Sequence, residues 1–134
     1  MDRKTLGTRL VILIVAIFAL NFLANKLYWY SSIWWFDMPM HALGGFWLSL
    51  VALYLLSPGG LTEFSTKHIF IIIVWVLVIG VGWELFEIFF NNYLAHAPFN
   101  TLDTLSDIFF DLTGGMIGLV YYARTFVSPI GNTV

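Results

Sequence analysis

Four stretches of mostly apolar residues, each long enough to cross a membrane, constrain this chain more than any other feature. A transmembrane α-helix needs about 20 such residues, and the stretches cover residues 10–28, 39–56, 68–90 and 104–122. Hydrophobic residues make up 60% of the chain and charged residues only 10%, whereas a soluble domain averages about 25% charged residues. The sequence therefore predicts an all-α, polytopic membrane protein with a single domain over residues 1–134, a bundle of four transmembrane helices.

The basic residues predict how this bundle is oriented, because cytoplasmic loops of membrane proteins are enriched in Lys and Arg. In a four-span topology, one side holds every basic residue except Lys26, namely Arg3, Lys4, Arg9, Lys67 and Arg124. We expect a multi-pass protein of the cell membrane with both termini in the cytoplasm, although so few charges leave the reversed topology open. The first span also resembles a signal peptide, but its length and the spans that follow favour an uncleaved anchor.

Six of the eight acidic residues fall in the outer half of this topology: Asp37, Glu84, Glu87, Asp103, Asp107 and Asp111. Asn21 and Asn25 end the first span at the same level. Aromatic residues favour membrane interfaces, and an outer belt is expected from Tyr28, Trp29, Tyr30, Trp34 and Trp35. Four segments that are distant in the sequence thus send polar groups to one end of the bundle.

Helical spacing of about 100° per residue gathers these polar groups on one face of each span. The three stripes are Asp37, His41 and Gly44; Gly80, Glu84, Glu87 and Asn91; and Asp103, Asp107, Asp111, Gly114 and Gly118. Small residues four apart, as at the last two glycines, let membrane helices approach closely. With a rise of about 1.5 Å per residue, Asp111 lies roughly 12 Å deeper than Asp103.

An ionised side chain at the centre of a bilayer costs roughly 2.5–3.5 kcal/mol even on the lenient insertion scale. Clustered acids therefore require compensation by protons, a cation or water, and Lys26 alone cannot neutralise six of them. With no Cys in the chain, any metal site must use oxygen and imidazole ligands, which suit Mg²⁺, Mn²⁺, Fe²⁺ or Zn²⁺. The candidate metal ligands are Asp37, His41, Glu84, Glu87, Asp103, Asp107 and Asp111.

Structural roles compete with metal binding at several of these positions. Asp37, before Met38 and Pro39, suits a helix N-cap, and Asp103 in a first turn would favour the helix dipole. The two glutamates near the end of a span, and His41, also fit buried hydrogen-bonded packing. His96, Asp2 and Glu63 are expected to be solvated.

Three short motifs follow one another along the chain: Asp37-Met-Pro-Met-His41-Ala-Leu-Gly-Gly45, Trp83-Glu84-Leu-Phe-Glu87 and Asp103-Thr-Leu-Ser-Asp107-Ile-Phe-Phe-Asp111-Leu-Thr-Gly-Gly115. In this order they resemble the VanZ-like superfamily of small bacterial membrane proteins, including its YjdF-type branch. Members often carry Asn where this chain has Asp111, so the site here is more acidic. The resemblance implies a role in the cell envelope and supplies no reaction.

Three functions remain open from the sequence. The first is a metal-dependent hydrolase or transferase that acts on lipid or lipid-linked headgroups at the outer leaflet. The second is a proton- or cation-coupled transporter or lipid-handling protein without catalysis, working as a homo-oligomer or with a partner. The third is an accessory membrane subunit whose acids meet basic groups of a partner. Six scattered basic residues make no basic patch, so no nucleic-acid binding is expected.

Overall fold

The computed structural model describes residues 3–57, 65–90, 93 and 99–127, and the elements within these residues are all helical. The helices are α1 (Arg3–Lys26), α2 (Trp29–Ser32), α3 (Asp37–Leu56), α4 (Thr66–Phe90) and α5 (Thr101–Phe126). The predicted all-α fold is confirmed. Within the described residues, α1, α3 and α4 are long and apolar enough to cross a membrane. Helix α5 has 26 residues but is not among these three, and its first half carries Asp103, Asp107 and Asp111.

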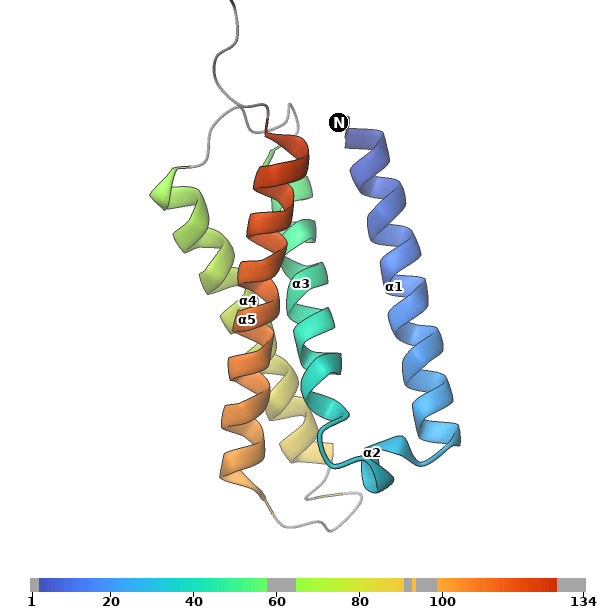
Figure 1. The fold of residues 1–134 in the computed structure, drawn as a ribbon. Coiled ribbons are helices and arrows are strands. Elements are labelled where there is room, and N and C mark those ends of the chain that lie inside the picture. Colours follow the sequence, from blue (N-terminus) through green and yellow to red (C-terminus); the bar gives the residue numbers. More distant parts are fainter. Residues whose placement is uncertain (1–2, 58–64, 91–92, 94–98, 128–134) are drawn as a thin grey trace, which may run out of the picture.

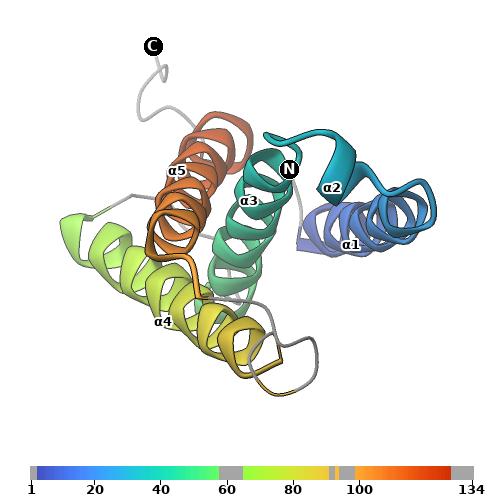
Figure 2. The same cartoon turned by 90° about the horizontal axis from the view of Figure 1, so that it is seen from below.

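The long helices alternate in direction along the bundle. Helices α1 and α4 run one way while α3 and α5 run the other, so α1 and α4 end where α3 and α5 begin (Figure 1). Viewed along the bundle, α3, α4 and α5 group together and α1 lies against the far side of α3 (Figure 2). This alternation brings the sequence-distant acidic segments to one end, which we call the acidic end.

Close contact between α3 and α5 depends on glycines at their crossing. A lipid environment gives little hydrophobic drive to helix association, so tight packing of small residues contributes much of it. A Cβ atom on Gly45 would overlap the backbone carbonyl of Asp111, and one on Gly114 would overlap the carbonyl of Ala42. A Cβ atom on Gly118 would overlap the hydroxyl of Ser49. These glycines let the two backbones approach each other directly.

Away from the acidic end, the interior of the bundle becomes apolar. The core there consists of Leu6, Leu10, Leu50, Ala52, Leu53, Ile72, Leu119 and Tyr122. Helix α1 joins this part of the bundle through polar contacts as well. The Trp47 indole donates a 2.9 Å hydrogen bond to the carbonyl of Leu10, and the Arg9 guanidinium donates to the Tyr121 hydroxyl. We call this half of the bundle the basic end, because it holds most of the Lys and Arg residues.

The sequence did not predict the short helix α2 between the first two long helices. Tyr28 precedes it with a φ of 58°, a left-handed conformation that turns the chain out of α1. Beyond it, Trp34 is 81% exposed and Trp35 is 50% exposed, as expected of an interface belt. Some predictions concern residues outside the described part of the chain, namely Asp2, Glu63, Asn91 and His96.

Candidate metal centre

Each of the three grouped helices buries one stripe, and each stripe becomes polar toward the acidic end. On α4 the buried residues are Ile72, Val76, Gly80 and Glu84. On α5 they are Asp107, Asp111, Gly114, Gly115, Gly118, Leu119 and Tyr122. On α3 they include His41, Gly45 and Ser49. Parts of the predicted polar stripes are thus buried: Gly80 and Glu84 on α4, most of the stripe on α5, and His41 alone of the stripe on α3.

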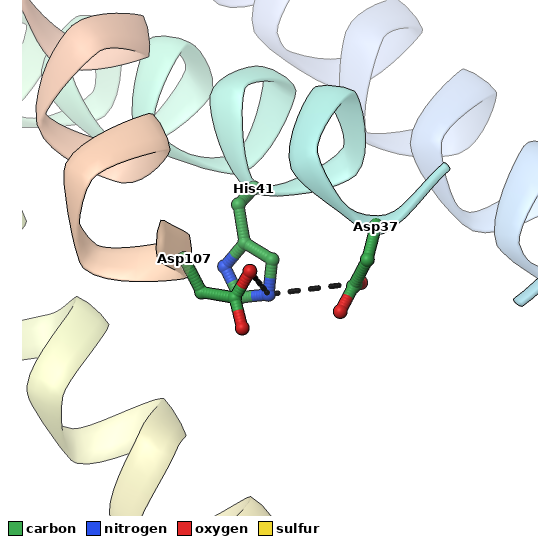
Figure 3. A group of neighbouring side chains, drawn as sticks. All are labelled: Asp37, His41 and Asp107. Carbon is green, nitrogen blue, oxygen red and sulfur yellow. Dashed lines mark ion pairs between the residues drawn. The ribbon is translucent and has the colours of Figure 1, made fainter. Parts of the chain in front are cut away.

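His41 lies at the centre of the polar residues. Its Nε2 atom is 3.7 Å from Oδ1 of Asp37 and 3.9 Å from Oδ1 of Asp107. Figure 3 shows both carboxylates approaching the same ring nitrogen: Asp37 comes from α3, the helix that also carries His41, and Asp107 comes from α5. Asp107 and His41 are both buried, whereas Asp37 at the start of α3 is half-buried. One ligand atom from each of the three lies within 4.8 Å of the others.

A second group on the α4 side shares the same histidine. Ligand atoms of His41, Glu84 and Glu87 also lie within 4.8 Å of one another. Glu84 is 4% exposed, and the Thr104 hydroxyl of α5 is near enough to interact with its carboxyl group. Its Oε1 atom is nevertheless buried without a hydrogen-bond partner. Burying a carboxylate oxygen without a hydrogen-bond partner destabilises the fold by roughly 1–3 kcal/mol or more. We therefore expect this oxygen to bind a proton or a ligand.

Asp111 approaches His41 from the other side of the ring. Its Oδ1 atom lies 3.4 Å from Nδ1 of His41. Gly80 of α4 makes room for this carboxylate, since a Cβ atom there would lie 2.6 Å from Oδ2 of Asp111. A carboxylate that holds one imidazole nitrogen orients the other nitrogen toward a metal. The geometry therefore suits Asp111 to fixing the ring of His41.

The cluster is short of positive charge. Five carboxyl groups surround one imidazole, and among the described residues none of the five has a Lys or Arg within ion-pair distance. Two carboxylates about 5 Å apart repel each other by on the order of 3 kcal/mol at an effective dielectric constant of about 20. Shared protons or a cation must offset this repulsion.

The spacing of the ligand atoms fits a bound metal. Ligands at about 2.1 Å from a common ion lie roughly 3.0–4.2 Å from one another in tetrahedral or octahedral geometry. The distances from Nε2 of His41 to Asp37 and Asp107 fall in this range. The other distances between ligand atoms within each group are at most 4.8 Å, slightly above the range. Small side-chain rotations would therefore bring carboxylates and imidazole to ligand distance without moving the helices.

Comparison with known proteins adds a family to this geometry. A family model described as "Predicted membrane protein (DUF2238)" matches residues 2–128. The chain belongs to this family. No curated protein and no solved structure matches the chain. The description of the family as predicted membrane proteins agrees with the three apolar helices.

Two parts of the predicted site are not brought into it. Asp103 is exposed and supplies no ligand atom to either group, although its charge acts on Asp37, Glu84 and Asp107. Asn21 and Asn25 lie at the acidic end as predicted, but the amide of Asn25 donates to Asn21. Helix α1 packs against the far side of α3 (Figure 2), which keeps these amides out of the ligand groups.

The capping roles expected of two aspartates have different outcomes. Helix α3 begins at Asp37, and its N-cap is Phe36 without a side-chain hydrogen bond. The prediction that Asp37 is the N-cap is therefore wrong, and its carboxylate faces His41 instead. For α5, Asn100 is the N-cap and its side chain accepts from the backbone N–H groups of Leu102 and Asp103. Asp103 thus occupies the first turn, as the dipole argument predicts.

Tyr30 is a residue near the site that the sequence argument placed only in the aromatic belt. Its hydroxyl donates a 2.7 Å hydrogen bond to Oδ1 of Asn21, and its ring packs edge-on against Phe36. Partial burial, together with the charges of Asp37 and Glu87, raises the pKa of Tyr30 to about 12. The phenol thus stays protonated near neutral pH. No spacing rule relates Tyr30 to the spans, so only its position beside Asp37 in the fold reveals its proximity.

Proposed function

We propose that this chain holds a divalent metal ion at the acidic end of its bundle and uses it as a hydrolase or transferase on lipid or lipid-linked headgroups. The single observation that carries the proposal is the buried, unpartnered Oε1 atom of Glu84 beside His41 and Glu87. An acid that only packed would find a hydrogen-bond donor in such a setting. A metal ion would satisfy this oxygen and offset the repulsion among its neighbours.

The proposed ligands come from both groups around His41. Asp37 and Asp107 face its Nε2 atom, while Glu84 and Glu87 approach from α4. Oxygen-rich sets with one imidazole suit Mg²⁺, Mn²⁺, Fe²⁺ or Zn²⁺. Such an ion would polarise a phosphoryl oxygen and favour deprotonation of water. A carboxylate left outside the ligand set would then accept a proton from the attacking water or hydroxyl group.

The position of the cluster supports a substrate at the membrane surface. We propose that α5 is a fourth span, since 26 residues extend about 39 Å and the helix packs against both α3 and α4 (Figure 2). The chain then forms one domain of four spans with both termini in the cytoplasm. The acidic end would face the outside, level with the exposed Trp34 and Trp35, where lipid headgroups lie.

The order of the three motifs supports placing the family within the VanZ-like superfamily, in its YjdF-type branch, with a role in the cell envelope. The structure supports this placement less directly, by bringing residues of all three motifs to one cluster: Asp37 and His41 from the first, Glu84 and Glu87 from the second, and Asp107 and Asp111 from the third.

Proton or cation transport by a single chain has weaker support. A transported ion needs polar groups along its whole path. From Asp111 toward the basic end, the buried side chains at the interface of α3, α4 and α5 are chiefly apolar, as at Leu50, Ile72 and Val76. Within the described residues, the buried acids and His41 are thus confined to one end, which is the arrangement expected of a surface-facing binding site.

Metal analysis of the purified protein tests the proposal. Wild-type protein prepared with divalent metal and then dialysed should retain the ion in stoichiometric amount, and Glu84→Gln should lose it. Asp103→Asn is the matched control, because it removes an acid at the same end that lies outside both ligand groups. Metal-free wild-type protein, or equal retention by both variants, would contradict the proposal. Release of headgroups from phospholipid vesicles by the metal-loaded protein, absent in Glu84→Gln, would establish the reaction.

A further inference from the structure

The basic end of the bundle carries a second feature, an apolar groove between α3 and α4. The groove has a volume of about 300 Å³ and is lined by Ala52, Leu55, Leu56, Ile71, Val74, Trp75 and Val78. Several of these side chains are exposed, including Leu55 at 56% and Val78 at 63%. In a membrane this surface faces lipid, and no residue of the carboxylate cluster lines the groove.

A cationic side chain lies on the same helix face as the groove. Lys67, Ile71, Val74 and Val78 are spaced by four, three and four residues, so they follow one stripe of α4. Lys67 is exposed and lies one turn before the lining residue Ile71, beyond the basic-end limit of the groove, which we call its mouth. A lipid phosphate beside Lys67 would place its acyl chain along the apolar residues of the next two turns.

The end of α3 supplies an independent observation at the same mouth. Ser57 directly follows Leu56 of the groove and is 8% exposed. Its hydroxyl is buried and lacks a hydrogen-bond partner. A buried hydroxyl without a partner is costly, and rotation of this side chain toward the groove would let the ester or phosphate oxygens of a phospholipid accept its hydrogen bond.

The dimensions of the groove agree with an acyl chain. From Ile71 to Val78 the helix rises roughly 10 Å, and one leaflet of hydrocarbon is about 15 Å thick. We propose that this groove binds one anionic phospholipid from the surrounding bilayer, with its headgroup at Lys67 and Ser57 and an acyl chain against Val74 and Trp75. Anionic lipids are enriched in the cytoplasmic leaflet, where the basic end is expected to lie.

Trp75 provides a native reporter inside the groove. The protein is placed in phosphatidylcholine vesicles that contain a small fraction of lipid brominated on its acyl chain, with either a phosphatidylglycerol or a phosphatidylcholine headgroup. The Trp75 contribution is the quenching lost in Trp75→Phe. We expect stronger quenching by the brominated anionic lipid, by about five-fold in relative affinity for one lysine.

Matched charge variants separate a specific site from general attraction. Lys67→Gln should abolish the preference for the anionic lipid, while Lys26→Gln, which removes the same charge at the acidic end, should preserve it. Ser57→Ala should weaken retention of phosphatidylglycerol when the detergent-extracted protein is analysed by native mass spectrometry. Equal quenching by both headgroups would overturn the proposal. Absence of Trp75 quenching together with cross-linked dimers would also overturn it, because a second copy would then cover the groove.

Discussion

Replacing Gly80 by alanine would place a methyl group where the Asp111 carboxylate now lies. The new Cβ atom would be 2.6 Å from Oδ2 of Asp111, whereas ordinary contacts begin at 3.4 Å, so the carboxylate must move by about 0.8 Å. The obstructed group is the end of a flexible side chain, and we therefore expect the fold to be retained. We expect the 3.4 Å contact between Oδ1 of Asp111 and Nδ1 of His41 to be lost.

Loss of this contact should weaken metal binding without removing any proposed ligand. Changes to residues that orient a metal-binding imidazole typically cost about 10- to 100-fold in affinity, or roughly 1.4–2.7 kcal/mol. Isothermal titration of the detergent-solubilised protein with Mn²⁺ or Zn²⁺ would measure the change, and circular dichroism would report helix content. We expect helix content to be unchanged and the affinity to fall by this factor.

Gly82→Ala is the matched control for this substitution. It lies two residues away on the same helix, carries the same change in helix propensity, and its Cβ atom would meet nothing within 4 Å. Its metal affinity should equal that of the wild type. If both variants bind metal equally well, Asp111 does not orient His41. If both lose metal equally, the effect belongs to α4 as a whole and the reasoning from the 2.6 Å distance fails.

Three other predictions follow from the packing and chemistry of the bundle. Gly45→Ala should destabilise it by about 3 kcal/mol or more, because the methyl group meets the Asp111 carbonyl, whereas Gly44→Ala, with its nearest neighbour at 3.9 Å, should be tolerated in thermal unfolding. Metal affinity measured by titration should fall as the pH is lowered, because carboxylate and imidazole ligands bind in deprotonated form and protons compete; pH-independent affinity would argue against these ligands. Trp47→Phe removes a hydrogen bond to the Leu10 carbonyl and should lower unfolding stability by about 1 kcal/mol; an unchanged unfolding midpoint would show that this bond contributes little.

The helical period accounts for the part of the site that the sequence predicted. Spacings of four residues placed Asp107 and Asp111 on one face of α5, and the same rule aligned Gly80 with Glu84 on α4. Alternating directions of the spans then required these faces to meet at one end. These conclusions needed only residue spacing and the length of a membrane-crossing helix.

The period also explains why Asp103 lies outside both ligand groups. Eight residues separate it from Asp111, which places the two about 80° apart around the helix at 100° per residue. Asp103 thus lies at the edge of the polar stripe of α5 and is exposed, whereas Asp107 and Asp111 are buried. Which part of the stripe is buried depends on how α5 packs against α3 through its glycines. Residue spacing alone does not reveal this packing.

Short-range chain geometry escaped the sequence argument altogether. Helix α2 depends on the left-handed conformation of Tyr28, which no glycine or asparagine signals there. The position of Tyr30 beside Asn21 follows from that turn. Likewise, the packing of α1 against α3 depends on contacts such as the hydrogen bond from the Trp47 indole to the Leu10 carbonyl. This packing leaves Asn21 outside the cluster.

Locating a bound ion in crystals of the protein would test the central claim most directly. Crystals grown with Mn²⁺ or Zn²⁺ would be measured at the absorption edge of each metal. We predict an anomalous difference peak between α3, α4 and α5 at ligand distance from His41 and Glu84. No peak there with either ion, with the carboxylates turned away from one another, would contradict the proposed metal centre.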